Sequence, residues 1–95
     1  MIIRLVRMQF HRRYCAEFEE MFAIVQPKIL AWEGCLKLHL LKDVDEPSTF
    51  LTLSHWKSEK NLEAYRNSAL FENTWAKTKV WFSAKPEAWS SKIVL

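Results

Sequence analysis

Aromatic rings gather in one short stretch of the chain, HWKSEKNLEAYRNSALFENTW, which spans residues 55–75. It holds two Trp, one Tyr and one Phe among charged and small polar residues. Such rings can pack in a core, form the wall of a pocket for a planar molecule, or stack on nucleic-acid bases. Aromatic residues at helical spacing are more often core, and in a small domain a pocket wall is also core. The stretch alone leaves these alternatives open.

Histidine and cysteine are the side chains that most often bind metals, but here their spacing forms no known metal motif. The three His fall on different predicted elements and form no HxxxH pair: His11, His39 and His55. The two Cys, Cys15 and Cys35, form neither a CxxC pair nor a disulfide framework. We therefore predict no metal site and two free thiols, while a disulfide between them stays an open alternative.

Length and composition predict one domain, residues 1–95, of ordinary globular character. The chain is 49% hydrophobic and 26% charged, with a formal net charge of +3. An excess of charge this small indicates solvated surfaces and no phosphate-binding stripe. Arg4 and Arg7 interrupt the apolar start, which is too short and too charged for a signal peptide or a membrane span. We expect a cytoplasmic protein without membrane contact.

The first half of the chain predicts a strand, a helix and a second strand. Residues 2–10 are apolar and end at a polar HRR, as is typical of a strand. A helical apolar face follows at steps of four, three and four: Phe18, Phe22, Val25 and Ile29. Pro27 lies within this pattern and should kink the helix or start a new turn. Gly34 suits the left-handed position after the helix. Residues 35–41 form the second strand, with Leu36, Leu38 and Leu40 on one face.

The second half predicts a strand, a broken helical region and a last strand. Residues 49–56 pair with residues 35–41 as an antiparallel hairpin. Ser58 and Ser68 each suit an N-cap, so the following helix is broken near Asn67 and its second part runs to Phe82. Residues 89–95 form the fourth strand.

This order, β-α-β-β-α-β, is the ferredoxin-like arrangement of the α+β class. It predicts one four-stranded antiparallel sheet with the helices on one face. The strands have apolar residues on both faces, whereas the helices can cover only one. We therefore expect a homodimer that buries the other face of the sheet.

One set of residues is similar to the signature of a known family. The set is Phe50, Leu53–Glu59, Leu62, Tyr65, Arg66, Ser68, Phe71 and Trp75, with Gly34-Cys35 and Lys85-Pro86 before two strands. It resembles the antibiotic biosynthesis monooxygenase family, whose members are dimeric α+β barrels. The resemblance covers nearly the whole chain. It implies a pocket in each subunit between the helices and the sheet.

The resemblance also implies a reaction: cofactor-independent oxygenation of a small aromatic substrate, such as a phenol or an anthrone, whose anion supplies electrons to dioxygen. The protein must bind a flat ring, help to remove a proton and stabilise the anion. For the ring we expect Trp56, Phe71, Trp75 and His39. For the proton and the anion we expect His55, Tyr65 and Arg7, with Arg4 as the alternative to Arg7. Phe71 and Trp75 should face the sheet, with Tyr65 at the rim of the pocket.

Other activities compete with this one. Haem-degrading relatives carry Asn, Trp and His where this chain has Val6, Tyr65 and Trp75, so haem degradation is disfavoured. An isomerase branch of the family, whose members carry His where this chain has Tyr65, stays an alternative. RNA-recognition modules share the strand order, but residues 49–56 lack the glycine of their signature. The alternative from a different class is a dimer that binds a small molecule, or is purely structural, without catalysis.

Overall fold

The computed structural model describes all residues, 1–95. It consists of four strands, three α-helices and one short 3-10 turn. In chain order they are β1 (Ile2–Gln9), η1 (Arg12–Tyr14), α1 (Cys15–Leu30), β2 (Cys35–Lys42), β3 (Thr49–Trp56), α2 (Glu59–Arg66), α3 (Ala69–Lys79) and β4 (Glu87–Ser91).

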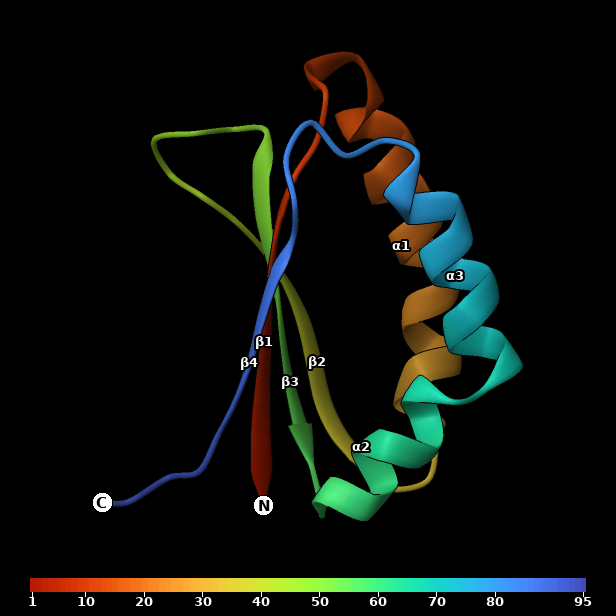
Figure 1. Cartoon of the computed structure of the whole chain (residues 1–95), viewed down its shortest axis with the longest axis vertical. Coiled ribbons are helices and arrows are strands. Elements are labelled where there is room, and N and C mark those ends of the chain that lie inside the picture. The colour runs from red at the N-terminus through yellow and green to blue at the C-terminus, as the bar shows by residue number, and fades with distance from the viewer.

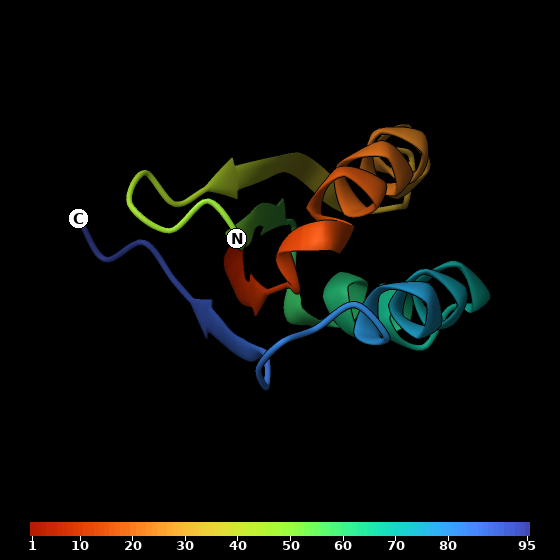
Figure 2. The same cartoon turned by 90° about the horizontal axis from the view of Figure 1, so that it is seen from above.

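The strands form one antiparallel sheet in the order β2-β3-β1-β4. All helices lie on the same face of this sheet, and the other face carries none (Figure 1). Seen from above, α1 and α3 run side by side over the sheet, and the C-terminal residues extend away from the helices (Figure 2). The predicted α+β, ferredoxin-like fold is therefore confirmed.

Serine caps and one glycine define the ends of the helices. The Oγ atoms of Ser58 and Ser68 accept hydrogen bonds from the backbone N–H groups of Asn61 and Phe71, at 3.2 and 3.1 Å. The helical region is broken between α2 and α3, as the two caps predict. Gly34 has φ +85°, and a Cβ there would lie 2.3 Å from Cγ of Asn61. This position needs glycine for its backbone conformation and for the close approach of α2.

Two predicted boundaries were wrong. Helix α3 ends at Lys79 and does not reach Phe82, which forms an isolated β-bridge with Phe10. The ring of Phe82 packs on that of Phe10 from a turn that returns to the sheet, so helical spacing misplaced it. Strand β4 covers Glu87–Ser91, because these residues pair with β1, and the expected range 89–95 extends past the sheet.

A third departure is a bulge in β2. The pairing of β2 with β3 shifts between Cys35 and Lys37. Leu38 and Leu40 share a face, as predicted, and that face is the one that the helices cover, but Leu36 is 51% exposed. The extra residue of a bulge breaks the alternation of side chains, so the period of two predicts only part of this strand. Pro27 lies in the last turn of α1, which ends three residues later at Leu30.

The core lies between the helices and the sheet and is built largely from rings. At one end Phe10, Phe18 and Phe50 contact one another, with ring centroids 4.2 to 5.7 Å apart. At the other end Trp56, which is 1% exposed, stacks on Tyr65. The pocket described below lies between these two groups of rings.

The face of the sheet without helices, termed the open face, carries the alternate residues of every strand. Its apolar side chains are Ile3, Leu5, Leu41, Leu51, Leu53 and Trp89. Leu41 and Trp89 are 42% and 45% exposed. None of the helices combines the length and the apolar character that crossing a bilayer requires.

Candidate functional site

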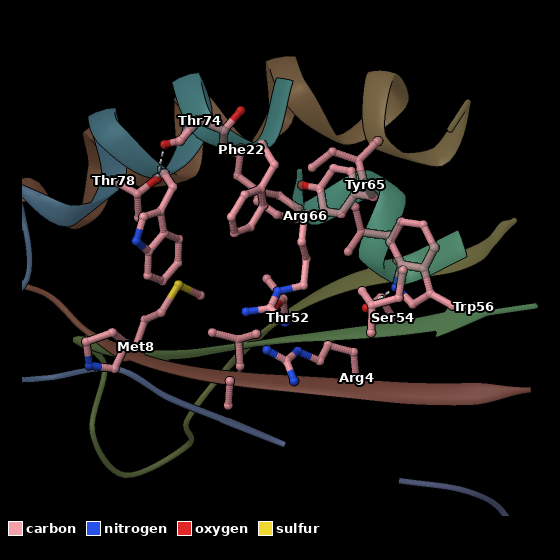
Figure 3. A pocket seen from close by; sticks show the side chains of 18 of the residues that line it. Arg4, Met8, Phe22, Thr52, Ser54, Trp56, Tyr65, Arg66, Thr74 and Thr78 are labelled. Atoms are coloured by element: carbon pink, nitrogen blue, oxygen red, sulfur yellow. Dashed lines mark hydrogen bonds between the residues drawn. The ribbon is translucent and has the colours of Figure 1, made fainter. Parts of the chain in front are cut away.

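A pocket of about 380 Å³ lies between the helices and the sheet. Figure 3 shows side chains from β1, β3, α1, α2 and α3 pointing into it. Most of the lining is hydrophobic. The volume falls within the range of pockets that bind small molecules.

One wall of the pocket is a chain of aromatic contacts. The rings of Trp56 and Tyr65 stack with centroids 5.1 Å apart, and Phe71 meets Tyr65 edge to face at 5.3 Å. Trp75 lies nearly parallel to Phe71, with centroids 5.9 Å apart. Ser58 and Ser68 make this wall possible, because each starts a helix that brings rings back over the sheet. Phe71 and Trp75 face the sheet, as predicted, and both are only partly buried.

Tyr65 lies deeper than its predicted position at the rim. Only 9% of the residue is exposed, since its ring is packed by Trp32, Trp56 and Phe71. Every fully buried side-chain oxygen in this structure has a hydrogen-bond partner. The Tyr65 hydroxyl makes no hydrogen bond. That hydroxyl therefore keeps accessible surface, and Figure 3 shows it pointing into the pocket. Burial, and to a smaller degree the charge of Cys35, raises the pKa of Tyr65 well above its usual value.

A second part of the pocket, termed the charged end, is positively charged. Arg4 on β1 and Arg66 at the end of α2 both line it, and their side chains reach toward each other (Figure 3). Arg4 Nη1 donates to Ser90 Oγ at 3.1 Å and is in no salt bridge. Burial, followed by the charge of Arg66, lowers the pKa of Arg4, while Glu63 opposes this. A guanidinium remains protonated at neutral pH even so.

Two of the hydroxyl groups that line the pocket, those of Ser54 and Thr78, already have hydrogen-bond partners. Trp56 Nε1 donates to Ser54 Oγ at 2.9 Å, and Thr78 Oγ1 donates to the Thr74 carbonyl at 2.8 Å. These bonds fix the side chains that they join. The groups that remain to bind a ligand include the Tyr65 hydroxyl, the two guanidiniums, and the hydroxyls of Thr52 and Thr74, which also line the pocket.

Three of the predicted site residues lie outside the pocket. These residues are Arg7, His39 and His55. They alternate along their strands with the residues that line the pocket, so their side chains lie on the open face. Arg7 pairs with Glu87 at 3.5 Å, and His55 Nδ1 lies 3.3 Å from Met1 Sδ. The structure thus brings Trp56, Tyr65, Phe71 and Trp75 together and leaves Arg7 and both histidines away from them.

Sequence reasoning gave Arg4 only as an alternative and overlooked Arg66 as a site residue. A signal for Arg4 was present, since it shares the parity of Ile2, Met8 and Phe10, all of which are buried. No comparable pattern marks Arg66, because its direction depends on how α2 lies over the sheet. For metals, the structure holds no group of three His, Cys, Asp or Glu side chains placed to bind an ion, and both cysteines are free.

Comparison with known proteins places the chain in a family. Residues 1–77 match the family model described as antibiotic biosynthesis monooxygenase. No curated protein matches the chain.

Solved structures under 25% identical show the same fold. A protein of Nitrosomonas europaea named after this family has a TM-score of 0.91 at 15% identity, with 100% of both chains covered. A conserved protein from Methanosarcina mazei has a TM-score of 0.90 at 20% identity, covering 97% of this chain and 92% of its own. A variant of SnoaB, a cofactor-independent oxygenase from Streptomyces nogalater, has a TM-score of 0.88 at 16% identity, with 99% and 93% covered. On the match over residues 1–77, the chain belongs to the antibiotic biosynthesis monooxygenase family.

Proposed function

We propose that this protein is a cofactor-independent monooxygenase that acts on a small, electron-rich aromatic substrate of the phenol or anthrone type. The observation that carries the proposal is a ring-walled pocket in which the guanidinium of Arg4 faces the cavity without a carboxylate partner. The name of the structural neighbour SnoaB, a cofactor-independent oxygenase, supports the reaction type.

The aromatic wall would hold the substrate ring. Phe71 and Trp75 are parallel within 13° and both are partly exposed to the cavity, so a planar molecule can pack against their free surfaces. Offset stacked and edge-to-face contacts each contribute about 0.5–1.5 kcal/mol beyond the burial of area. The wall therefore selects flat substrates without fixing their substituents.

The charged end would stabilise the substrate anion. A cation within hydrogen-bonding distance lowers the pKa of a phenol, because it favours the ionised form. Arg4 supplies that charge, and the Tyr65 hydroxyl, whose raised pKa keeps it protonated, can donate to the same oxygen. Tyr65 thus suits a hydrogen-bond donor and does not suit a base.

The atoms and electrons of the proposed reaction balance without a redox group on the protein. An anthrone-type CH₂ loses one proton, and the resulting carbanion gives its electron pair to dioxygen. With a proton from solvent this yields a hydroperoxide on the ring carbon. Loss of water from the hydroperoxide gives the quinone carbonyl, so one oxygen atom remains in the product and the other leaves as water.

One observation favours the second candidate, a non-catalytic protein that binds a small molecule. The pocket lining contains no histidine, and its single carboxylate, Glu87, is paired with Arg7 on the open face. A catalytic pocket of this kind must pass the first proton to water. A binding protein has no such need.

Oxygen uptake separates the two candidates. We expect the protein to accelerate the conversion of anthrone to anthraquinone, with one dioxygen consumed for each quinone formed. Arg4→Gln should lower the rate by about 100-fold, as loss of one oxyanion donor does in other enzymes. Arg12→Gln is the matched control, since Arg12 is exposed on η1 and outside the pocket lining.

Two results would count against the oxygenase. Uptake no faster than the spontaneous reaction, with anthrone bound in the pocket, would leave only the binding protein. Equal losses in Arg4→Gln and Arg12→Gln would show that the charged end has no special role.

We also propose that the protein works as a homodimer joined through the open face. The support is the row of apolar side chains across all four strands, in which Leu5 lies between Leu53 and Trp89. Burying such a face in two copies suits an interface on the order of 2,000 Å² in total. Leu5→Asp should yield monomers at micromolar concentration in sedimentation, whereas Val44→Asp, at a position 94% exposed, should not. A wild-type monomer at that concentration would end this proposal.

A further inference from the structure

The charged end of the pocket holds two arginines from distant parts of the chain, and their placement has a consequence for the substrate. Arg4 comes from β1 and Arg66 from the last turn of α2. Their guanidiniums converge on one side of the cavity (Figure 3). The ring wall, which ends at Trp75, lies within the same cavity.

Neither arginine is neutralised well by the protein itself. The one side-chain hydrogen bond of Arg4 goes to the neutral hydroxyl of Ser90, at 3.1 Å, and Glu63 acts on Arg4 by its charge without forming a salt bridge to it. Arg66 Nη1 lies 3.6 Å from Glu63 Oε2, and the side chains of the two are 44% and 64% exposed. An exposed pair of this kind is weak, so it compensates little of the positive charge that faces the pocket.

A second explanation accounts for Arg66 but not for the pair. A cation in the last turn stabilises the C-terminal end of a helix, and Arg66 occupies that place in α2. This effect does not require the Arg66 side chain to approach Arg4. Two like charges close together in a partly buried site repel each other, which is unfavourable. An anionic ligand bound between the two guanidiniums would turn this repulsion into a net attraction.

The shape of the two groups indicates which anion. A guanidinium presents a planar fork of N–H donors that matches the two oxygens of a carboxylate. A carboxylate offers about four lone-pair sites, enough to accept from both arginines at once. A neutral phenol in its ground state has only one oxygen and no charge, so it leaves both cations unpaired until it ionises.

We propose that the substrate is an aromatic carboxylic acid whose carboxylate is bound between Arg4 and Arg66, with a ring hydroxyl beside it that reaches Tyr65. The inference rests on the proposed function for the flat ring and its hydroxyl. The carboxylate anchors the ring before any proton is removed, and the ring then lies along Phe71 and Trp75. The pocket thus binds an ortho-hydroxyaryl carboxylate in preference to a plain phenol.

Binding without turnover tests this directly. We would titrate the full-length protein under anaerobic conditions with 1-hydroxy-2-naphthoate and with 1-hydroxy-2-naphthamide, which has the same rings and no charge. Calorimetry should show that the acid binds about 10- to 100-fold more tightly than the amide, as expected for hydrogen bonds to a charged group. Arg4→Gln and Arg66→Gln should each remove most of this preference, while Arg12→Gln should retain it.

The variants also exclude a purely structural role. A role in stability alone moves the melting temperature but not the ratio of the two dissociation constants. Arg66→Gln, at an exposed position, keeps the test usable if Arg4→Gln fails to fold. Arg4→Lys should bind the acid with intermediate affinity, because it keeps the charge and loses the fork.

Each outcome bears on one proposal separately. Equal binding of acid and amide by the wild-type protein would overturn the carboxylate site, even if anthrone is oxygenated. Preferential binding of the acid, lost in both Gln variants, would support the site even if no substrate consumes dioxygen. An acid preference that survives both Gln substitutions would also overturn it.

Discussion

The two faces of the sheet are built from the same strands but differ in what they can do. On β1, Arg4 points to the helices and Arg7 to the open face, three residues further along. Arg7 is paired with Glu87, on the neighbouring strand, whereas Arg4 has no carboxylate partner and faces a cavity. Residue type alone therefore does not identify a site residue. The face on which the strand places it, and the partners it has there, do so.

The rings follow the same division. Trp56 is 1% exposed on the helix side, while Trp89 is 45% exposed on the open face. The stacking on Tyr65 and the hydrogen bond to Ser54 both hold the indole of Trp56 in its orientation. We expect substitutions on the helix side to change stability and ligand binding, and substitutions on the open face to change assembly.

The largest effect should come from Trp56→Ala. It removes a fully buried ring and leaves Ser54 without its donor, so the free energy of unfolding should fall by about 3–5 kcal/mol. Urea denaturation measures this loss. Val80→Ala, at a position 68% exposed, is the control and should change stability by no more than about 0.5 kcal/mol. A loss for Trp56→Ala as small as that of the control would show that the helix side of the sheet is not the core.

Trp75→Ala should have a smaller effect. The ring is partly exposed and lines the cavity, so its removal enlarges the pocket and creates no sealed void. We expect roughly half the loss of Trp56→Ala or less, together with weaker binding of a planar phenol. Urea denaturation and a phenol titration on the same samples measure both. A loss of stability equal to that of Trp56→Ala would show that Trp75 is core and not pocket wall.

Alkaline pH should weaken the fold through Tyr65. Its pKa is raised by burial in the folded state above the value of about 10 in an unfolded chain. Above that pH the unfolded chain releases the phenol proton and the folded protein retains it, so stability falls as pH rises, by at most about 1.4 kcal/mol per unit. Tyr65→Phe should remove this share of the decline between pH 9 and 11. An unchanged decline would mean that Tyr65 is not the group concerned.

The smallest effect should come from Arg7→Ala. Its ion pair with Glu87 is 3.5 Å long, and the two side chains are 38% and 57% exposed. Exposed pairs of this kind contribute about 0–1 kcal/mol, so in the monomeric Leu5→Asp variant, whose open face stays in solvent, Arg7→Ala should change the free energy of unfolding little. Binding of the aromatic acid should not change at all, in contrast to Arg4→Gln. Weaker acid binding in Arg7→Ala would show that both faces contribute to the site.

The fold was predictable because its signals are local. The apolar steps of α1, the caps at Ser58 and Ser68, and the hairpin of β2 and β3 each depend on neighbouring residues. Errors arose where distant contacts decide. Phe82 is paired with Phe10, and the bulge at the start of β2 turns Leu36 outward.

The site was predictable only in part, for the same physical reason. The rings of Trp56, Phe71 and Trp75 follow from strand and helix periods, which fix the face of a side chain. Their grouping with Arg66 depends on how α2 sits over the sheet. His39 and His55 were predicted as site residues from their chemical type, although their positions in the alternation of β2 and β3 place their side chains on the face away from the pocket.

Indole signals offer the most direct test of the central claim, that the ligand site is the pocket on the helix side of the sheet. The five Trp residues each give one indole N–H signal in a ¹H–¹⁵N spectrum. On titration with 1-hydroxy-2-naphthamide, which does not depend on the carboxylate site, we predict shifts at Trp56 and Trp75 and none at Trp89. Shifts at Trp89, with Trp56 and Trp75 unchanged, would place the ligand on the open face and rule out the pocket on the helix side as its site.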